Sequence, residues 1–216
     1  MKQTLLHDQE SGLQSLLYLP PNYEQQDRWP LILFLHGAGE RGDDPVKLLD
    51  QPLPKMLETD DLPFVVISPQ CPLGIWWTGY LEPVKQLLRR TQREYKIDRG
   101  RTYLTGISMG AYGSWQLAME EPRTFAAVVP ICGGWPWYDT INDQVCRLKE
   151  TPIWAFHGAE DDVVSANETI ILVEALRACG GDPRMTIYPE LKHDSWTVTY
   201  ANKGLYEWLL EHTTAP

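Results

Sequence analysis

Apolar residues recur along this chain in short runs that are separated by more polar stretches. The clearest run, residues 31–35, is an unbroken series of leucine, isoleucine and phenylalanine between Pro30 and the glycine-rich stretch 36–42. A continuous apolar run of this length is typical of a strand buried on both faces of a sheet. Similar runs predict strands over residues 13–19, 64–68, 102–105, 125–129, 152–156 and 185–188.

The stretches between these runs predict helices. In residues 84–95, Val84, Leu87 and Leu88 fall near one face, while the lysine and the arginines fall largely elsewhere. Further helices are predicted over residues 109–119, 167–178 and 205–210. Strands that alternate with helices indicate the α/β class, with a mostly parallel central sheet flanked by helices on both faces. Ligands of such sheets bind where the carboxyl ends of strands run into loops.

Size and charge narrow the range of functions. A chain of 216 residues, 43% of them hydrophobic, is expected to form a single domain over residues 1–216. The formal net charge of −10 argues against nucleic acid as a partner, because phosphate binding needs clustered lysine and arginine. It also disfavours anionic lipid surfaces and strongly acidic substrates. An uncharged small molecule is the expected substrate.

The chain start and the cysteines bear on the compartment. The first residues contain no apolar run long enough for a signal peptide, and no later run approaches a membrane-spanning length. We therefore expect no membrane insertion. The cysteines Cys71, Cys132, Cys146 and Cys179 are widely spaced and form no metal-type pair, so we expect four reduced thiols in a cytoplasmic protein without metal or cofactor.

A candidate nucleophile lies in the segment Gly106-Ile107-Ser108-Met109-Gly110, which matches the Gly-x-Ser-x-Gly nucleophile elbow. The elbow is a sharp turn from strand to helix that exposes the serine, and small residues on each side let the neighbouring strand and helix approach. The alternative is an ordinary glycine-rich turn with a capping serine. The predicted strand just before the motif and the predicted helix just after it favour the elbow.

A second glycine-rich segment, residues 36–42, directly follows the buried run 31–35. This is the expected position of a loop that donates a backbone N–H to the oxyanion of an acyl-transfer reaction. The predicted donors are the N–H groups of Ala38 and of Met109, the residue after the serine. His36 precedes Ser108 in the chain, so we expect it to brace the loop by hydrogen bonds and not to act as the base.

The base and the acid should follow the serine in the order acid, then histidine. Of the later histidines, His157 precedes a glycine as His36 does and is expected to brace its loop, and His212 lies in the carboxyl tail. His193 lies after the last predicted strand and before the last helix, where the base is expected. The acid should come from Glu160, Asp161 or Asp162, among which spacing does not choose; Asp194 ranks lower because neighbouring side chains diverge.

Residues 36–42, 106–110 and 157–164 together resemble the small serine esterases of the phospholipase/carboxylesterase branch. They are also similar to feruloyl-esterase-like and polyhydroxybutyrate-depolymerase-like α/β-hydrolases. The resemblance covers most of residues 30–200 and implies the α/β-hydrolase fold. Those families carry a His-Gly-x-x-Asp-x-x-Val segment whose aspartate is the triad acid, which implies Asp161 here. Ser165 stands where the family often has proline, and this departure does not affect the acid.

Tryptophan is abundant, with nine in the chain. Trp115, Trp154 and Trp208 fall within predicted elements and are expected in the core. Five others fall in predicted loops near the edge of the sheet that should hold the site, and we expect them to line a flat aromatic cleft: Trp76, Trp77, Trp135, Trp137 and Trp196. Residues 132–151 leave room for a loop and one helix but not for a cap domain, so the cleft should be open.

The sequence thus predicts a serine esterase in which Ser108 attacks the ester carbonyl, His193 moves the proton and Asp161 holds the base. An open cleft favours short-chain acyl or aryl esters, with feruloyl and acetyl-sugar esters among them. A serine peptidase or amidase could use the same triad, although 216 residues leave no room for a gating domain. A catalytically silent binding module on the same scaffold is a third reading.

Overall fold

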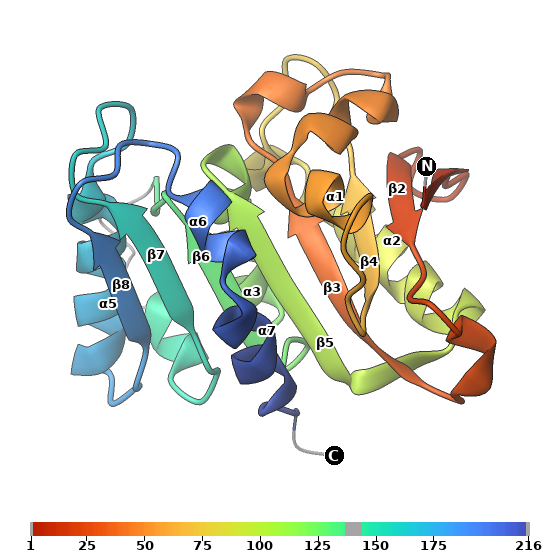
Figure 1. Ribbon diagram of the computed structural model, residues 1–216. Coiled ribbons are helices and arrows are strands. Elements are labelled where there is room, and N and C mark those ends of the chain that lie inside the picture. Colours follow the sequence, from red (N-terminus) through yellow and green to blue (C-terminus); the bar gives the residue numbers. More distant parts are fainter. Residues whose placement is uncertain (1, 137–143, 215–216) are drawn as a thin grey trace.

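The computed structural model describes residues 2–136 and 144–214. Its strands form one sheet in the order β1-β2-β4-β3-β5-β6-β7-β8 (Figure 1). β1 pairs antiparallel with β2 and β2 with β4, whereas all the other neighbours are parallel. The strands are β1 (Gln3–His7), β2 (Gln14–Tyr18), β3 (Trp29–Leu35), β4 (Val65–Pro69), β5 (Ile97–Ile107), β6 (Ala127–Ile131), β7 (Trp154–Gly158) and β8 (Arg184–Tyr188).

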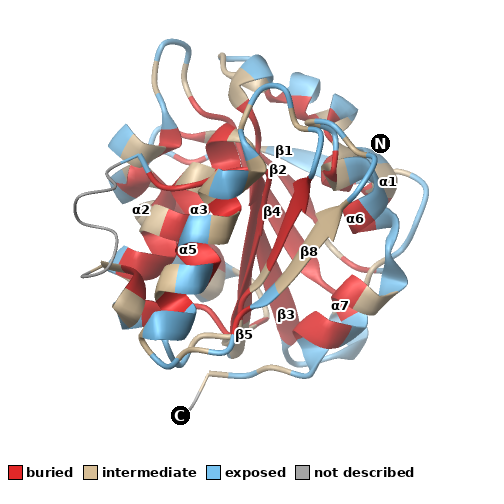
Figure 2. Ribbon diagram, turned by 90° about the vertical axis from the view of Figure 1, so that its left-hand side faces the viewer, coloured by how far each residue is buried: buried red, intermediate tan, exposed pale blue. Residues whose placement is uncertain are grey.

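Helices cover both faces of the sheet, as Figure 2 shows edge-on. One layer holds α2 (Leu81–Glu94), α3 (Met109–Glu120) and α5 (Ala166–Ala178). The other holds α1 (Pro52–Leu57), α6 (Trp196–Ala201) and α7 (Lys203–Leu210). The predicted α/β architecture, with a mostly parallel sheet between two helical layers, is confirmed.

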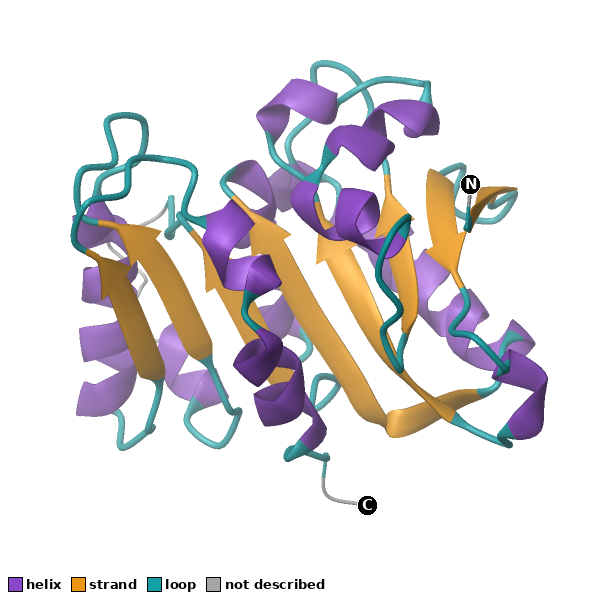
Figure 3. Cartoon of the chain, viewed as in Figure 1, coloured by secondary structure: helices purple, strands orange, loops and turns teal. Residues whose placement is uncertain are grey.

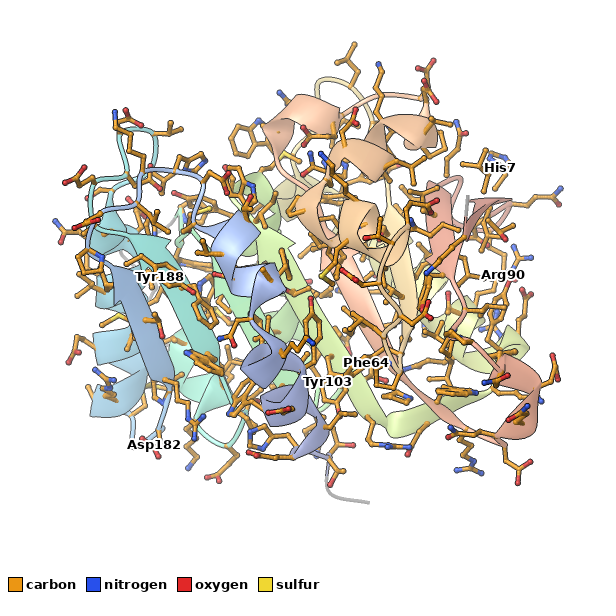
Figure 4. The ribbon with its side chains drawn as sticks, viewed as in Figure 1. His7, Phe64, Arg90, Tyr103, Asp182 and Tyr188 are labelled. Carbon is orange, nitrogen blue, oxygen red and sulfur yellow. A yellow bond between two sulfur atoms is a disulfide. The ribbon has the colours of Figure 1, made fainter. Side chains whose placement is uncertain are left out.

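The buried strand β3 explains the unbroken apolar run. All seven of its residues are buried. Because side chains alternate between the faces of a strand, Leu31, Leu33 and Leu35 pack with the α2–α3–α5 layer, while Ile32 and Phe34 pack with the opposite layer. In that second layer, Phe64 and Tyr103 meet edge to face with ring centroids 5.9 Å apart (Figure 4).

Two cysteines depart from the sequence-based expectation. Cys146 and Cys179 form a disulfide with their Cα atoms 5.3 Å apart, so the prediction of four free thiols is wrong. The short 3-10 helix Cys146–Leu148 packs against the carboxyl end of α5, and sequence spacing does not reveal this contact. Cys71 and Cys132 are free and buried. Because two of the cysteines form a disulfide, the cysteines no longer argue for a cytoplasmic location.

The connection from β6 to β7 contains no cap domain within the residues that the structure describes. The same residues include no helix that is both long enough and apolar enough to cross a membrane.

Candidate active site

The carboxyl ends of β3, β5, β7 and β8 lie at one edge of the sheet because these strands run parallel (Figure 1). Ser108 follows β5, Asp161 follows β7 and His193 follows β8. Gly37, after β3, is also close to the serine, since a Cβ built on it would lie 3.8 Å from the Ser108 Cβ. The fold therefore gathers four separate segments at one place.

Ser108 occupies a strained turn between β5 and α3. Its φ of 50° and ψ of −118° lie outside the regions that L-residues ordinarily adopt. A Cβ on Gly106 would overlap the Gly110 backbone, and one on Gly110 would overlap the Leu35 carbonyl. Only glycine fits at these two positions, so the elbow can pack tightly against β3 while the serine side chain remains free to project.

Three side chains form a continuous hydrogen-bonded chain at this edge. His193 Nε2 lies 3.0 Å from Ser108 Oγ, and His193 Nδ1 lies 2.7 Å from Asp161 Oδ2. Both distances are those of ordinary hydrogen bonds. With Nδ1–H donating to the carboxylate, Nε2 is free to accept the serine proton. The structure thus brings together the three residues that the sequence analysis selected.

The Asp161 carboxylate takes part in three hydrogen bonds and lies close to a second imidazole. Its Oδ1 accepts from the backbone N–H groups of Val163 and Val164, each at 2.9 Å. Its Oδ2 lies near two imidazoles, His193 and, at 3.1 Å, His157 Nε2. Burial disfavours the charged carboxylate, but the hydrogen bonds from His193, Val164 and Val163 outweigh it and lower the pKa of Asp161. The acid is therefore ionised at neutral pH.

The neighbouring carboxylates do not contact His193 in the same way. Asp162 is exposed and pairs with Lys192 at 3.1 Å. Asp194 accepts from the backbone N–H and the hydroxyl of Thr197, each at 3.0 Å, and so caps the start of α6. Glu160 is exposed. Among the carboxylates that spacing left equivalent, Asp161 is the one bonded to His193.

His157 braces its loop as expected and also contacts the acid, a contact that sequence reasoning missed. The ring is fully buried, and Nε2 faces the Val164 carbonyl at 2.9 Å as well as Asp161. Nδ1 lies 2.8 Å from the Thr169 hydroxyl. Burial lowers the pKa of His157 despite these acceptors. Because Nε2 faces two acceptors, the hydrogen of the neutral ring is placed on Nε2.

The loop after β3 is braced by His36. Cys71 N donates to His36 Nε2 at 2.9 Å, so Nδ1 carries the hydrogen and donates to Gly37 O at 2.6 Å. Burial lowers the pKa of His36 to about 4, which keeps the ring neutral. Ala38 is the first residue of the next turn, and Met109 is the first of α3. The Met109 N–H belongs to a helix terminus, where donors lack intrahelical acceptors.

Of the five tryptophans predicted to line the cleft, two are buried. Trp77 is fully buried, donates to His36 O at 3.0 Å and packs edge-on against the His36 ring, so it supports the loop and does not line a cleft. Trp135 is also buried. Loop position alone did not reveal that these two rings are buried. Trp137 lies outside the described residues.

The other two predicted wall residues are accessible. Trp76 is 49% exposed, and the Arg41 guanidinium lies 5.7 Å from its ring centroid. Trp196 is half-buried and starts α6 instead of lying in a loop; its ring meets His193 edge to face at 5.2 Å. The expected core tryptophans Trp115 and Trp208 are buried, and Trp154 is partly buried against Trp208.

Among the described residues, one group of side chains has the donor atoms of a potential metal site within 4.8 Å of one another. It consists of Cys132, Asp161 and His193. Burial raises the pKa of the Cys132 thiol well above its usual range, so the thiolate that metals prefer is disfavoured. Asp161 and His193 are already bonded to each other. The Cys132 thiol therefore lies buried beside the bonded Asp161–His193 pair.

Comparison with known proteins agrees with this geometry. The model of the phospholipase/carboxylesterase family matches residues 79–203, more than half of the chain. A bifunctional acetylxylan esterase/xylanase from Neocallimastix patriciarum is 29% identical over 163 residues, which cover 73% of this chain and 23% of that protein.

Solved structures show the same fold. A thermostable esterase superposes with a TM-score of 0.81 at 34% identity, over 98% of this chain and 62% of that one. A feruloyl esterase module from Clostridium thermocellum, solved with sinapinate, has a TM-score of 0.71 at 15% identity, over 96% and 85% of the two chains. The chain therefore spans less than two thirds of the thermostable esterase and about a quarter of the acetylxylan esterase/xylanase.

Proposed function

Because the chain belongs to the phospholipase/carboxylesterase family, we propose that it is a serine hydrolase of carboxylic esters, with Ser108, His193 and Asp161 as its triad. The observation that carries the proposal is the hydrogen-bonded chain from Ser108 Oγ through His193 to Asp161, at 3.0 and 2.7 Å. The strained backbone of Ser108 adds support, since it is the conformation a nucleophile elbow requires.

The reaction follows from this arrangement. Ser108 Oγ attacks the ester carbonyl as His193 Nε2 takes its proton, and Asp161 stabilises the resulting imidazolium. The N–H groups of Met109 and Ala38 stabilise the oxyanion. His193 then gives its proton to the leaving alcohol, and a water activated by the same base hydrolyses the acyl-enzyme.

Short-chain acyl and aryl esters are the proposed substrates. The related proteins include an acetylxylan esterase/xylanase and a feruloyl esterase module. The first name refers to a small acyl group and the second to an aromatic one. The exposed Trp76, whose ring lies 5.7 Å from the Arg41 guanidinium of the loop after β3, gives this chain a flat aromatic surface on which a small or aromatic acyl group can rest.

Two substitutions and one probe test the proposal. Ser108→Ala and His193→Ala should each lower kcat on 4-nitrophenyl acetate by on the order of a thousandfold while the melting temperature stays near that of the wild type. A fluorophosphonate probe should label the wild type and spare the Ser108→Ala variant. Activity within about tenfold of wild type in a folded His193→Ala protein would refute the base assignment.

The acid has a matched control one residue away. Asp161→Asn should lower kcat strongly, by on the order of a thousandfold or more, because an amide in that place disturbs the tautomer of His193. Asp162→Asn removes an exposed charge that pairs with Lys192 and should leave kcat nearly unchanged. A larger loss in the Asp162→Asn variant would move the acid by one residue.

A further inference from the structure

Two loops carry the groups that should contact the acyl half of an ester. Because β3 and β4 are parallel neighbours, the loops that follow them leave the same edge of the sheet side by side (Figure 3). The loop after β3 carries the proposed oxyanion donor Ala38, next to Gly37, which lies close to Ser108. The loop after β4 carries Trp76, the proposed acyl-binding ring. The relative position of these two groups therefore depends on contacts between separate segments.

The inner parts of the two loops are joined by buried groups. Cys71 N donates to His36 Nε2 at 2.9 Å. Gln70, which is almost fully buried, donates through Nε2 to the Glu40 carbonyl at 2.8 Å. These bonds fix the start of the loop after β4 against the loop after β3. They do not extend to its outer part, residues 72–76.

The outer part of the loop after β4 has little internal support. Leu73 is 79% exposed and Trp76 is 49% exposed. Gly74 has a φ of 76°, so the chain turns sharply at the tip. Ile75 N donates to the Pro72 carbonyl at 3.3 Å, which is longer than most N–H···O bonds. A segment with so few contacts of its own takes the position of its ring from its neighbours.

Arg41 reaches from the loop after β3 to this outer part. Its Nε donates to the Ala38 carbonyl at 2.9 Å, and its Nη1 donates to the Ile75 carbonyl at 3.3 Å. Its guanidinium carbon lies 5.7 Å from the centroid of the Trp76 ring, within the range of a cation–π contact. One side chain thus contacts the residue that bears the oxyanion N–H, the backbone next to the acyl-binding ring, and the ring itself.

The shape of the guanidinium explains why arginine can make these contacts together. Its N–H donors diverge in one plane, so Nε and Nη1 can bond two carbonyls while the group lies over an aromatic ring. On the other side of Ala38, His36 Nδ1 donates to the Gly37 carbonyl at 2.6 Å. The peptide groups before and after Ala38 are therefore both held, and Arg41 holds the second of them together with the Trp76 loop.

We propose that Arg41 is a positioning residue that holds the Ala38 oxyanion donor and the Trp76 ring in one geometry, and so controls selectivity for the acyl group. The inference rests on the proposed esterase activity and adds a residue that acts through these two groups. Without the side chain, the Ala38 N–H loses one of its restraints, which lowers the rate for every ester. The Trp76 ring also loses its support, which lowers the rate further for an aromatic acyl group.

Two esters with the same leaving group separate these effects. 4-Nitrophenyl acetate depends on the oxyanion donor, whereas 4-nitrophenyl ferulate also needs the aromatic surface. Arg41→Ala should lower kcat/KM by about tenfold on the acetate and by about a hundredfold on the ferulate. Free guanidinium, well below its denaturing concentration, should raise both values severalfold in this variant and leave the wild type unchanged, because it can occupy the place of the missing group.

Three variants complete the test. Lys47→Ala removes an exposed cation from the same connection and should change neither value by more than about twofold. Trp76→Ala should lower the ferulate value more than the acetate value and should not respond to guanidinium, because its arginine is still present. Arg41→Lys keeps the charge but loses the planar donors, so the ratio of the ferulate value to the acetate value should fall at least about threefold.

Melting temperatures of all the variants show which are folded, and Arg41→Lys supplies the test if Arg41→Ala is not. A structural role alone would lower the melting temperature and both kcat/KM values alike. Equal losses on the two esters, a loss that guanidinium does not reverse, or a wild-type ratio in Arg41→Lys would each overturn the proposal. Failure of the esterase proposal gives a different result, because the wild type would then hydrolyse neither ester.

Discussion

At the scale of single residues, one carboxylate oxygen of Asp161 lies close to two histidine rings. Asp161 Oδ2 lies 2.7 Å from His193 Nδ1 and 3.1 Å from His157 Nε2, and Oδ1 is held by two backbone N–H groups. The buried His157 ring thus packs against the same carboxylate oxygen that His193 contacts. We expect His157 to act as a positioning residue through Asp161.

We expect His157→Leu to lower kcat by about 10- to 100-fold, since a carboxylate that no longer packs against the His157 ring holds His193 less precisely in its reacting geometry.

His157→Gln is the control, because its side-chain amide can still donate near the position of Nε2. It should restore most of kcat. If both variants melt lower but keep the wild-type kcat, His157 has a structural role alone.

Sequence reasoning found these site residues unevenly. Ser108 and His193 follow from a motif and from chain order, which reflect backbone geometry. Asp161 followed only from the family resemblance, because side-chain direction distinguishes it from its neighbours, and that direction is set by the N–H groups of Val163 and Val164. The burial of Trp77 depends on packing with His36, which no local pattern encodes.

At the scale of elements, His36 ties the end of β3 to the residues after β4. Its neutral ring accepts from Cys71 N, and burial holds its pKa near 4 in the folded protein against an ordinary value of 6.5. Because the folded pKa lies below the unfolded one, the unfolded state binds the proton more readily. His36 therefore leaves the free energy of unfolding undiminished well above pH 6.5 and lowers it as the pH falls from about 6.5 toward 4.

We expect this residue alone to remove about 2.5 kcal/mol from the free energy of unfolding between pH 7.5 and pH 4.5. The measurement is urea unfolding at both pH values. His36→Gln offers an uncharged amide oxygen to Cys71 N, so its loss of stability over the same interval should be smaller by that amount. Equal losses in the two proteins would show that His36 does not govern the acid response.

The disulfide is a second link between elements, joining the segment before β7 to the end of α5. It closes a loop with a sequence separation of 33, for which loop entropy gives about 3–4 kcal/mol of stabilisation. Reductant should therefore lower the melting temperature of the wild type and leave a Cys146→Ser/Cys179→Ser double variant unaffected. Thiol titration of the unfolded, unreduced protein should report two thiols; four would contradict the bond.

The elements missed by the sequence analysis are those with weak local patterns. β1 (Gln3–His7) has one buried residue at the sheet edge, so it lacks the apolar run that marked the central strands. α1 and α6 have six residues each, which is less than two turns. Their positions are set by packing on the face that also holds α7, whereas the long helices carry their own periodicity.

At the scale of the whole molecule, the site lies at an edge of the sheet that no cap domain covers within the described residues. Trp76, which contacts Arg41 in the loop after β3, is half-exposed. An acyl chain bound on such a surface stays partly in contact with water. Each methylene contributes about 0.8 kcal/mol to binding only when it is removed from water, so lengthening the chain should add little.

We therefore expect kcat/KM on 4-nitrophenyl esters to be highest for short acyl chains and to fall toward palmitate. Methyl ferulate should also be hydrolysed, because a flat aromatic acyl group can stack on an exposed ring without an enclosed tunnel. The series from acetate to palmitate, measured below the concentration at which each ester aggregates, gives the profile. A maximum at laurate or a longer chain would mean that an enclosed apolar channel forms around the acyl group, which an uncovered edge cannot provide.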